Sequence, residues 1–382
     1  MQIDQLTKIV EITEGSTKLL VPENSLKVNA PPKDPAFFNP RAKLNRDLSV
    51  IASSSFLKNF KGQKIFLDSL AGVGARSIRI ANEIKNTEKV IVNDINAKSI
   101  ELAEKSAKLN DIQNCEFSEN EACRFLSLHS KRGERGAIVD IDPFGSPSRY
   151  IDCGIRATAH GGLLALTATD LPVLHGLFQN ACKKKYYGVP VRTEFSNEIA
   201  LRLIMGCIHL IGGRFDVRCL PLFVHTDMHY YRVYVRILVN SEVEDRMGFI
   251  VFCNKCGHRR LQKEPENLCE VCKQKTELAG PLWIDSLFNK SFIETMLMEY
   301  QKYSVDKRCE KILAKSLEEA EMSGTYFTLD EVASRMKSAP LGLDNALEKL
   351  HAAGYFATST SLNPTGFRTN CRIDEIIKIF SN

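Results

Sequence analysis

Between Lys64 and Asp170 the chain alternates short apolar runs with stretches of helical periodicity. The apolar runs have no polar alternation, so both faces of each strand are covered, which is typical of a parallel sheet flanked by helices. We predict strands over 65–69, 89–94, 115–118, 137–142 and 162–170, and helices over 76–84, 97–109, 121–128, 148–157 and 194–210. Two long strands, 218–224 and 230–239, are close enough in sequence to pair antiparallel. The pattern predicts a Rossmann-like α/β fold, a parallel sheet with one antiparallel edge strand.

The length of the chain predicts a second domain. A chain of 382 residues is too long for one compact core. We place the boundary so that residues 1–245 hold the sheet and residues 246–382 form a smaller α+β domain.

The second domain begins with a cysteine cluster. C-N-K-C and C-E-V-C are separated by twelve residues, and each pair can seat two thiolates on a tight turn. A redox dithiol would explain one pair but not both. Four thiolates close a tetrahedron around Zn²⁺ without an open position, so we predict a structural zinc site. Its ligands are Cys253, Cys256, Cys269 and Cys272.

The last hundred residues predict helices over 296–303 and 309–322, then two short helices and a short paired segment. Two helices followed by a small wing are the pattern of a winged-helix module. Such a module binds nucleic acid about as often as it binds protein.

Composition limits the cellular setting and the partners. The N-terminus lacks a basic segment followed by an apolar one, and no apolar run approaches the roughly 18 to 20 residues of a membrane span. We therefore expect a soluble, cytoplasmic protein with no membrane partner, whose cysteines are reduced thiols or metal ligands. Lys and Arg number 51 against 46 Asp and Glu, so any basic surface must come from local clustering.

A glycine-containing loop, D-S-L-A-G-V-G-A-R-S, follows the first predicted strand. Gly72 and Gly74 allow close approach of the backbone to a ligand, and the helix that follows can receive a negative group. A dinucleotide-binding loop would carry a third glycine where Ser77 stands. The loop therefore disfavours a pyrophosphate ligand.

Acidic residues follow three successive strands. Asp68 ends the first and Asp94 the second, where a carboxylate can accept both ribose hydroxyls, and Glu121 follows the third. Such a set suits a nucleoside that carries positive charge and no phosphate. S-adenosylmethionine, with a sulfonium and an ammonium, fits this description.

The stretch I-V-D-I-D-P-F-G-S-P ends the fourth strand. Pro143 fixes its own φ and restricts Asp142, so the carboxylate leaves the strand end in a set direction. Phe144, with Phe38 as the opposite face, is predicted to stack a flat, amine-bearing base. The alternative is that Asp142 or Ser146 caps the next helix.

Taken together, these motifs resemble the tRNA (guanine-N2-)-dimethyltransferase family over nearly the whole chain. The resemblance rests on F-F-N-P-R, D-S-L-A-G-V-G-A-R-S-I-R, V-N-D-I-N, D-I-D-P-F-G-S-P, G-G-L-L-A-L-T-A-T-D, H-Y-Y-R-V-Y-V-R and the cysteine cluster. It implies an S-adenosylmethionine-dependent methyltransferase domain and a tRNA guanine, usually at position 26, methylated once or twice on its exocyclic amine. Asp142 is then the acid/base candidate. The implied cofactor contacts are Arg41, Arg76, Asp94, Glu121 and Ala122, to which the loop adds Asp68 and Gly72.

Two positions depart from the family pattern. Glu121 stands where the family more often has aspartate, and Ala42 where it often has methionine. We expect a monomer that acts on tRNA. The competing hypotheses are a zinc-ribbon and winged-helix RNA-binding protein with a non-catalytic methyltransferase-like domain, and a methyltransferase acting on another base or on protein.

Overall fold

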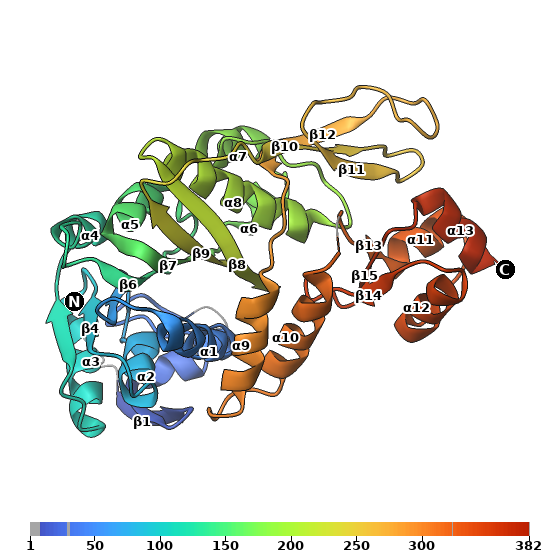
Figure 1. The fold of residues 1–382 in the computed structure, drawn as a ribbon. Helices are drawn as coiled ribbons and strands as arrows, with labels where there is room; N and C mark the ends of the chain where they lie inside the picture. Colours follow the sequence, from blue (N-terminus) through green and yellow to red (C-terminus); the bar gives the residue numbers. More distant parts are fainter. Residues whose placement is uncertain (1–7, 29–30, 323, 382) are drawn as a thin grey trace, which may run out of the picture.

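The computed structural model describes residues 8–28, 31–322 and 324–381. Its centre is a seven-stranded sheet with the order β5-β4-β3-β6-β7-β9-β8 (Figure 1). The strands are β3 (Ile65–Asp68), β4 (Lys89–Asn93), β5 (Cys115–Ser118), β6 (Gly136–Ile141), β7 (Thr158–Ala168), β8 (Val217–Asp227) and β9 (Tyr230–Val239).

The first five strands are parallel, as the unbroken apolar runs predicted. β9 is the reversed strand and pairs antiparallel with both β7 and β8. The reversed strand therefore lies next to the edge, and β8 itself forms the edge. The predicted α/β class is confirmed.

Helices cover both faces of the sheet. One face carries α1 (Lys43–Asn59), α2 (Ala75–Glu83) and α3 (Ala97–Leu109), and the other carries α4 (Ala122–Leu128), α5 (Ile151–Ala157) and α8 (Ser196–Gly213). An insertion after β7 forms α6 (Leu171–Leu174) and α7 (Gln179–Tyr186). Short 3-10 turns lie at η1 (Glu23–Leu26), η2 (Pro40–Ala42) and η3 (Ser148–Tyr150), and an N-terminal hairpin pairs β1 (Ile9–Glu14) with β2 (Thr17–Pro22).

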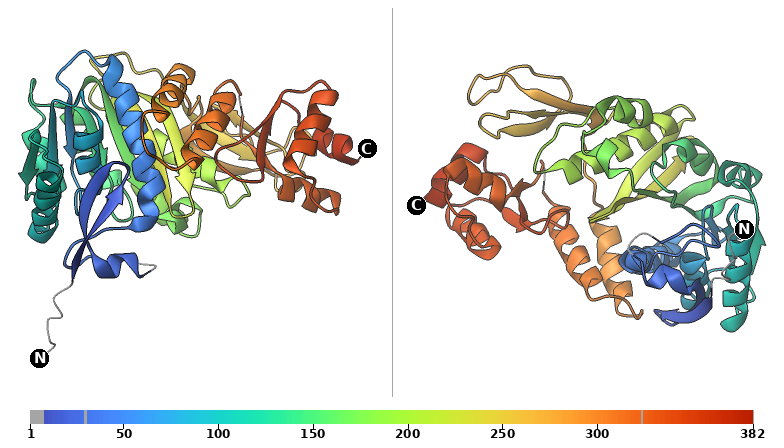
Figure 2. Two further views of the ribbon diagram at one scale, coloured as in Figure 1. Left: turned by 90° about the horizontal axis from the view of Figure 1, so that it is seen from below. Right: turned by 180° about the vertical axis from the view of Figure 1, so that it is seen from behind.

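The chain continues into a three-stranded sheet and two helices. The small sheet consists of β10 (Met247–Phe252), β11 (Arg259–Gln262) and β12 (Glu277–Trp283), and β12 packs on α8. α9 (Lys290–Tyr300) and α10 (Arg308–Glu319) follow, and α9 packs against α1. The two helices lie between the large sheet and the C-terminal module in both views of Figure 2.

The C-terminal module has the predicted winged-helix pattern with an added last helix. It comprises β13 (Phe327–Thr328), α11 (Leu329–Met336), α12 (Leu343–Ala352), β14 (Ala357–Ser359), β15 (Gly366–Thr369) and α13 (Ile373–Ser381). Thr328 caps α11, because its hydroxyl accepts from the Glu331 amide at 3.1 Å.

Buried apolar side chains form two clusters. The larger cluster includes side chains from the large sheet, β10, β12, α9 and α10, and the smaller lies wholly within 327–380. The small sheet and the two helices after it thus share the core of the large sheet. The division of the chain at residue 245 stays a prediction.

Candidate active site

Asp142 follows the last residue of β6, at the edge where the parallel strands end. Its side chain is 28% exposed, and its carboxylate accepts a hydrogen bond from Nη2 of Arg76. No side-chain hydrogen bond caps η3 or α5, so Asp142 does not close the following turn. The Ser146 hydroxyl accepts from the Ser148 amide at 3.3 Å, a local bond within the turn. The capping alternative is therefore not supported for Asp142, and Ser146 contributes only this local bond.

Arg76 joins Asp142 to a buried network of charges. Arg76 Nε lies 3.4 Å from Asp140 Oδ1, and its Nη1 donates to Asn45 Oδ1 at 3.0 Å. Asp140 also pairs with Arg232, whose Nη1 donates to Thr167 Oγ1 at 2.7 Å. Two arginines thus neutralise two aspartates at the end of β6, which satisfies charges that would be costly to bury alone. The network fixes the direction of the Asp142 carboxylate.

Asp68 lies behind this network rather than in an open crevice. It is 2% exposed, and its carboxylate accepts from the Ser77 hydroxyl and, at 3.4 Å, from the Leu70 amide. Burial, and then repulsion from Asp140, raise the pKa of Asp68 to about 7. This geometry does not support the expected direct contact of Asp68 with the cofactor, because both carboxylate oxygens accept hydrogen bonds from the loop and helix that follow β3. Asp68 holds the loop in place.

The glycine loop closes onto another part of the chain. Gly72 has φ of 55°, and a Cβ there would lie 2.8 Å from the carbonyl oxygen of Phe37. Its amide donates to Asp94 Oδ2 at 2.8 Å, and the Asn96 amide donates to Asp94 Oδ1 at 2.9 Å. A side chain at position 72 would therefore collide with the backbone of Phe37, so this position requires glycine. Asp94 is half-buried and oriented by two backbone amides, and its remaining lone pairs are available for hydroxyl groups.

Glu121 and Ala122 begin α4 at the end of β5. Glu121 caps the helix, because Oε2 accepts from the Arg124 amide at 3.0 Å, and its Oε1 lies 3.7 Å from Arg149 Nη2. Ala122 is buried. Arg41 is exposed on η2, after the capping residue Asn39, whose side chain accepts from the Arg41 amide.

The two phenylalanines expected to stack a base, Phe144 and Phe38, lie in different environments. Phe144 is 56% exposed, and its ring meets Phe37 edge to face at a centroid distance of 4.6 Å. The prediction for Phe38 is wrong: its ring is 2% exposed in the core, beneath the guanidinium of Arg46 at 4.9 Å. A buried ring cannot present a face to a base. Phe37 takes its place beside Phe144.

The loop that carries Phe144 is braced from β7 and α7. The Gly145 amide donates to Thr169 Oγ1 at 2.7 Å. Ser146 donates to the Tyr186 hydroxyl at 2.8 Å, and Tyr186 donates to Asp170 Oδ1 at 2.7 Å. Burial, reinforced by Asp170, raises the pKa of Tyr186, so the phenol stays protonated as a donor.

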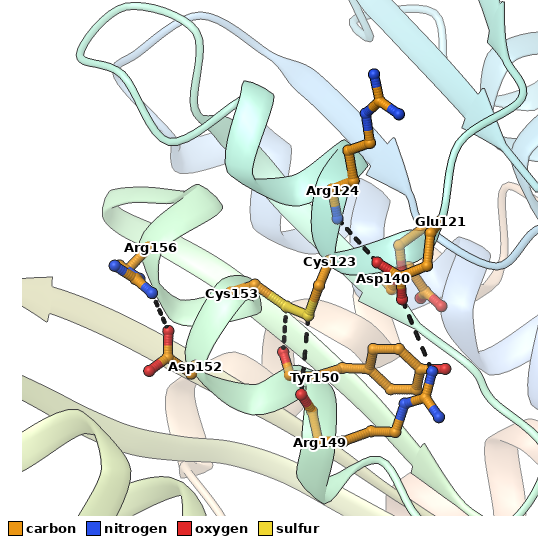
Figure 3. Close-up of a disulfide and its surroundings, with 10 residues drawn as sticks. Glu121, Cys123, Arg124, Asp140, Arg149, Tyr150, Asp152, Cys153 and Arg156 are labelled. Atoms are coloured by element: carbon orange, nitrogen blue, oxygen red, sulfur yellow. Dashed lines mark hydrogen bonds and ion pairs between the residues drawn. A yellow bond between two sulfur atoms is a disulfide. The ribbon is translucent and has the colours of Figure 1, made fainter.

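A disulfide joins the helices that flank this edge. Cys123 on α4 and Cys153 on α5 are bonded (Figure 3). The expectation of reduced thiols is therefore wrong for this pair. The two residues are 30 positions apart, and packing of α4 against α5 brings their Cα atoms to 5.6 Å, a proximity that the sequence does not reveal.

The four predicted zinc ligands converge. Within the described residues their sulfur atoms all lie within 4.8 Å of one another. The two turns have matching geometry: the Gly257 amide donates to the Cys253 carbonyl at 2.7 Å, and the Lys273 amide donates to the Cys269 carbonyl at 2.9 Å. Four convergent thiols fit Zn²⁺ with no position left for substrate water. A metal held there would be structural, and none of the strand-end acids is among its four ligands.

Cations near the first cysteine turn are used within the protein. Arg259 is buried, donates to both oxygens of Glu331 at 2.8 and 2.9 Å, and lies 4.0 Å from the ring centroids of Phe195 and Phe327. Arg260 pairs with Glu266 and Glu270. Neither arginine is therefore free to bind an RNA phosphate in this arrangement. Arg259 instead attaches the small sheet to the winged-helix module.

The strand order, the reversed β9 and the acidic residues at successive strand ends define a Rossmann-like methyltransferase fold. A family model described as N2,N2-dimethylguanosine tRNA methyltransferase matches residues 15–381. The chain belongs to this family.

Similar proteins agree over almost the full length. A tRNA (guanine(26)-N(2))-dimethyltransferase of Methanobrevibacter smithii is 30% identical, covering 98% of both chains, and one of Methanosarcina acetivorans is 32% identical, covering 96% of this chain and 97% of its own. The solved complex of Trm1 from Pyrococcus horikoshii with S-adenosyl-L-methionine superposes with a TM-score of 0.81 at 26% identity, covering 97% of this chain and 99% of that one.

Three residues of the site escaped the sequence reasoning. Asp140 is the one charged residue of β6, and Arg232 is the buried one of the two arginines of β9; a charge within a buried strand requires a partner. That signal could have paired them. Tyr186 gave no such signal, because its contact with Ser146 depends on where α7 folds back.

Proposed function

We propose that the protein methylates the exocyclic N2 amine of guanine 26 in tRNA, once or twice, with S-adenosylmethionine as methyl donor. The observation that carries the proposal is the Asp142 carboxylate, oriented by Arg76 and partly exposed at the strand-end edge beside the exposed ring of Phe144. Family membership and the relatives named for this reaction support the same assignment.

The residues at this edge suit the cofactor. S-adenosylmethionine carries two positive centres, no phosphate and two ribose hydroxyls, and it supplies a methyl group already activated on sulfur. Asp94 would accept from the hydroxyls, and Arg41, Glu121 and Ala122 would line the rest of the binding site. Arg76 would affect the site by orienting Asp142. Asp68 and Gly72 would affect cofactor binding by holding the glycine loop in its shape.

The residues of the chain then have separate tasks. The lone pair of a guanine amine is delocalised into the ring, so the amine must be held in line with the bond to be broken. Asp142 accepts an N–H of the amine, which localises the lone pair, and takes the proton that the product loses. Phe144 and Phe37 hold the flipped base.

The experiment is methyl transfer to a transcript tRNA, with mass spectrometry of its nuclease fragments. We expect N2-methylguanosine and N2,N2-dimethylguanosine in the fragment that contains position 26. A transcript with adenosine at position 26 is the matched control and should gain no methyl group. Equal methylation of both transcripts, or of neither, would contradict the proposal, and the latter is what a non-catalytic RNA binder would give.

We propose in addition that the enzyme acts as a monomer, since every residue assigned above to the active site lies within one chain. We also propose that it meets tRNA in the cytoplasm. No helix within 8–28, 31–322 and 324–381 is long and apolar enough to cross a bilayer. Light scattering should give one species near 42.9 kDa.

A further inference from the structure

A cavity of about 1040 Å³ lies at the edge of the sheet opposite to Asp142. Its lining includes Gln63, shortly before β3, and Arg135, directly before β6, so it lies where the parallel strands begin. Val239 ends the antiparallel strand β9 and therefore reaches the same edge. None of the residues assigned to the methyl-transfer site lines this cavity.

The lining is strongly one-sided in charge. Four of its fourteen residues are permanent cations, and none is Asp or Glu. The four are Lys61, Arg132, Arg135 and Arg236. The chain as a whole has an excess of only five positive charges, so this is a local concentration. The neighbouring Glu134 is exposed and does not line the cavity.

These four cations do not form ion pairs that stabilise the fold. Throughout the described part of the chain, none of the four pairs with a carboxylate. Arg135 Nε donates to the Ser130 carbonyl at 2.8 Å, and Arg236 Nε approaches the Gly161 carbonyl at 3.5 Å. Both bonds use Nε, so the terminal nitrogens of each guanidinium remain for an anion.

The remaining lining favours a backbone-like ligand. Gly133 and Gly161 have φ of 88° and 76°, and a Cβ at either position would meet no atom within 4 Å. Neighbouring side chains therefore do not crowd these positions, and the main chain is open to close approach. Asn59, Gln63 and Asn240 add amide groups that can both donate and accept.

We propose that this groove binds the phosphodiester backbone of the tRNA substrate, away from the guanine that reacts. The inference rests on the proposed function and extends it. Asp142 lies seven positions after Arg135 along an extended strand, about 23 Å at about 3.3 Å per position, so one nucleotide cannot span both sites. Four cations around an open cavity suit several phosphates better than one small anion.

The test is tRNA binding without methyl donor over a range of salt concentrations. The groove variant Lys61→Gln/Arg132→Gln/Arg236→Gln keeps Arg135, which holds its turn through Ser130. The matched control Lys18→Gln/Lys85→Gln/Lys108→Gln removes the same charge from exposed positions outside the cavity. A circular dichroism melt should show both variants folded.

We expect the groove variant to bind tRNA at least tenfold more weakly at 0.1 M salt. Its plot of log affinity against log salt should be shallower by about 2 to 3, since each phosphate contact contributes about 0.7 to 0.9. The control should change affinity less than twofold. Turnover at saturating tRNA should be unchanged for both, because the cavity is remote from Asp142.

Equal affinity and slope for groove variant and control would overturn the inference. Titration with inorganic phosphate tests the competing ligand: phosphate binding lost in the groove variant while tRNA affinity stays intact would also overturn it. The binding assay is independent of catalysis. A wild-type protein that methylates no tRNA but shows the groove effect would sink the proposed function and leave the groove in place.

Discussion

Asp68 is expected to make the stability of the fold depend on pH. Its pKa is raised to about 7 in the folded protein by burial and then by Asp140, whereas the pKa of an unfolded aspartate is about 3.9. A carboxyl with a raised folded pKa stabilises the fold while it is protonated. That contribution is complete below about pH 4 and is lost as the pH rises through about 7.

The perturbation is Asp68→Asn, which keeps an acceptor for the Ser77 hydroxyl and cannot ionise. Between pH 5 and pH 7 the folded wild type keeps a proton that the unfolded chain has lost. Each pH unit then costs the wild type about 1.4 kcal/mol relative to the variant. The difference in the free energy of unfolding, variant minus wild type, should therefore increase by about 3 kcal/mol from pH 5 to pH 8.

The assay is urea unfolding of both proteins at pH 5, 6, 7 and 8. Asp111→Asn is the control, because Asp111 is exposed and its left-handed φ of 54° suits asparagine equally well. Its difference from the wild type should not change with pH. A difference for Asp68→Asn that is also constant with pH would refute the assignment of a buried, proton-binding Asp68.

Three further variants test other parts of the structure. Atomic absorption should find one zinc ion per chain in the wild type and in Cys115→Ser, and none in Cys256→Ser; retained zinc in Cys256→Ser would exclude this ligand set. Arg259→Ala should lower the free energy of unfolding by about 3 kcal/mol, because the buried Glu331 keeps only Arg335, 3.5 Å away, as a charged partner, and a loss below about 1 kcal/mol would show that the pair is not needed. Tyr186→Phe should reduce kcat about tenfold through the lost link between Ser146 and Asp170, with cofactor affinity and melting temperature unchanged. An unchanged kcat would show that this link does not position the loop.

The sequence predicts the sheet well because local signals determine it. Apolar runs without alternation favour buried strands, and β3, β4, β6 and β7 lie where those runs are. The cysteine spacing was equally decisive, since two turns of two thiols have one economical arrangement.

The prediction failed where a residue's role depends on distant packing. Phe37 and Phe38 are adjacent and chemically identical, and the path of the segment over Gly72 decides which ring faces solvent. Asp68 and Asp94 both lie at strand ends in the sequence, but Asp68 is buried under its own loop, whereas Asp94 is only half-buried. The Cys123–Cys153 bond and the partners of Arg259 likewise depend on helices that meet only in the folded chain.

The most direct measurement concerns the carboxylate at the end of β6. Single-turnover methyl transfer to tRNA by Asp142→Asn should be about 10² to 10⁴ slower than by the wild type, the range expected for a lost acid/base group. Calorimetric binding of S-adenosylmethionine should be nearly unchanged, since Arg76 keeps Asp140 as a partner. A variant that transfers methyl groups at the wild-type rate, or one that fails to bind the cofactor, would contradict the role assigned to Asp142.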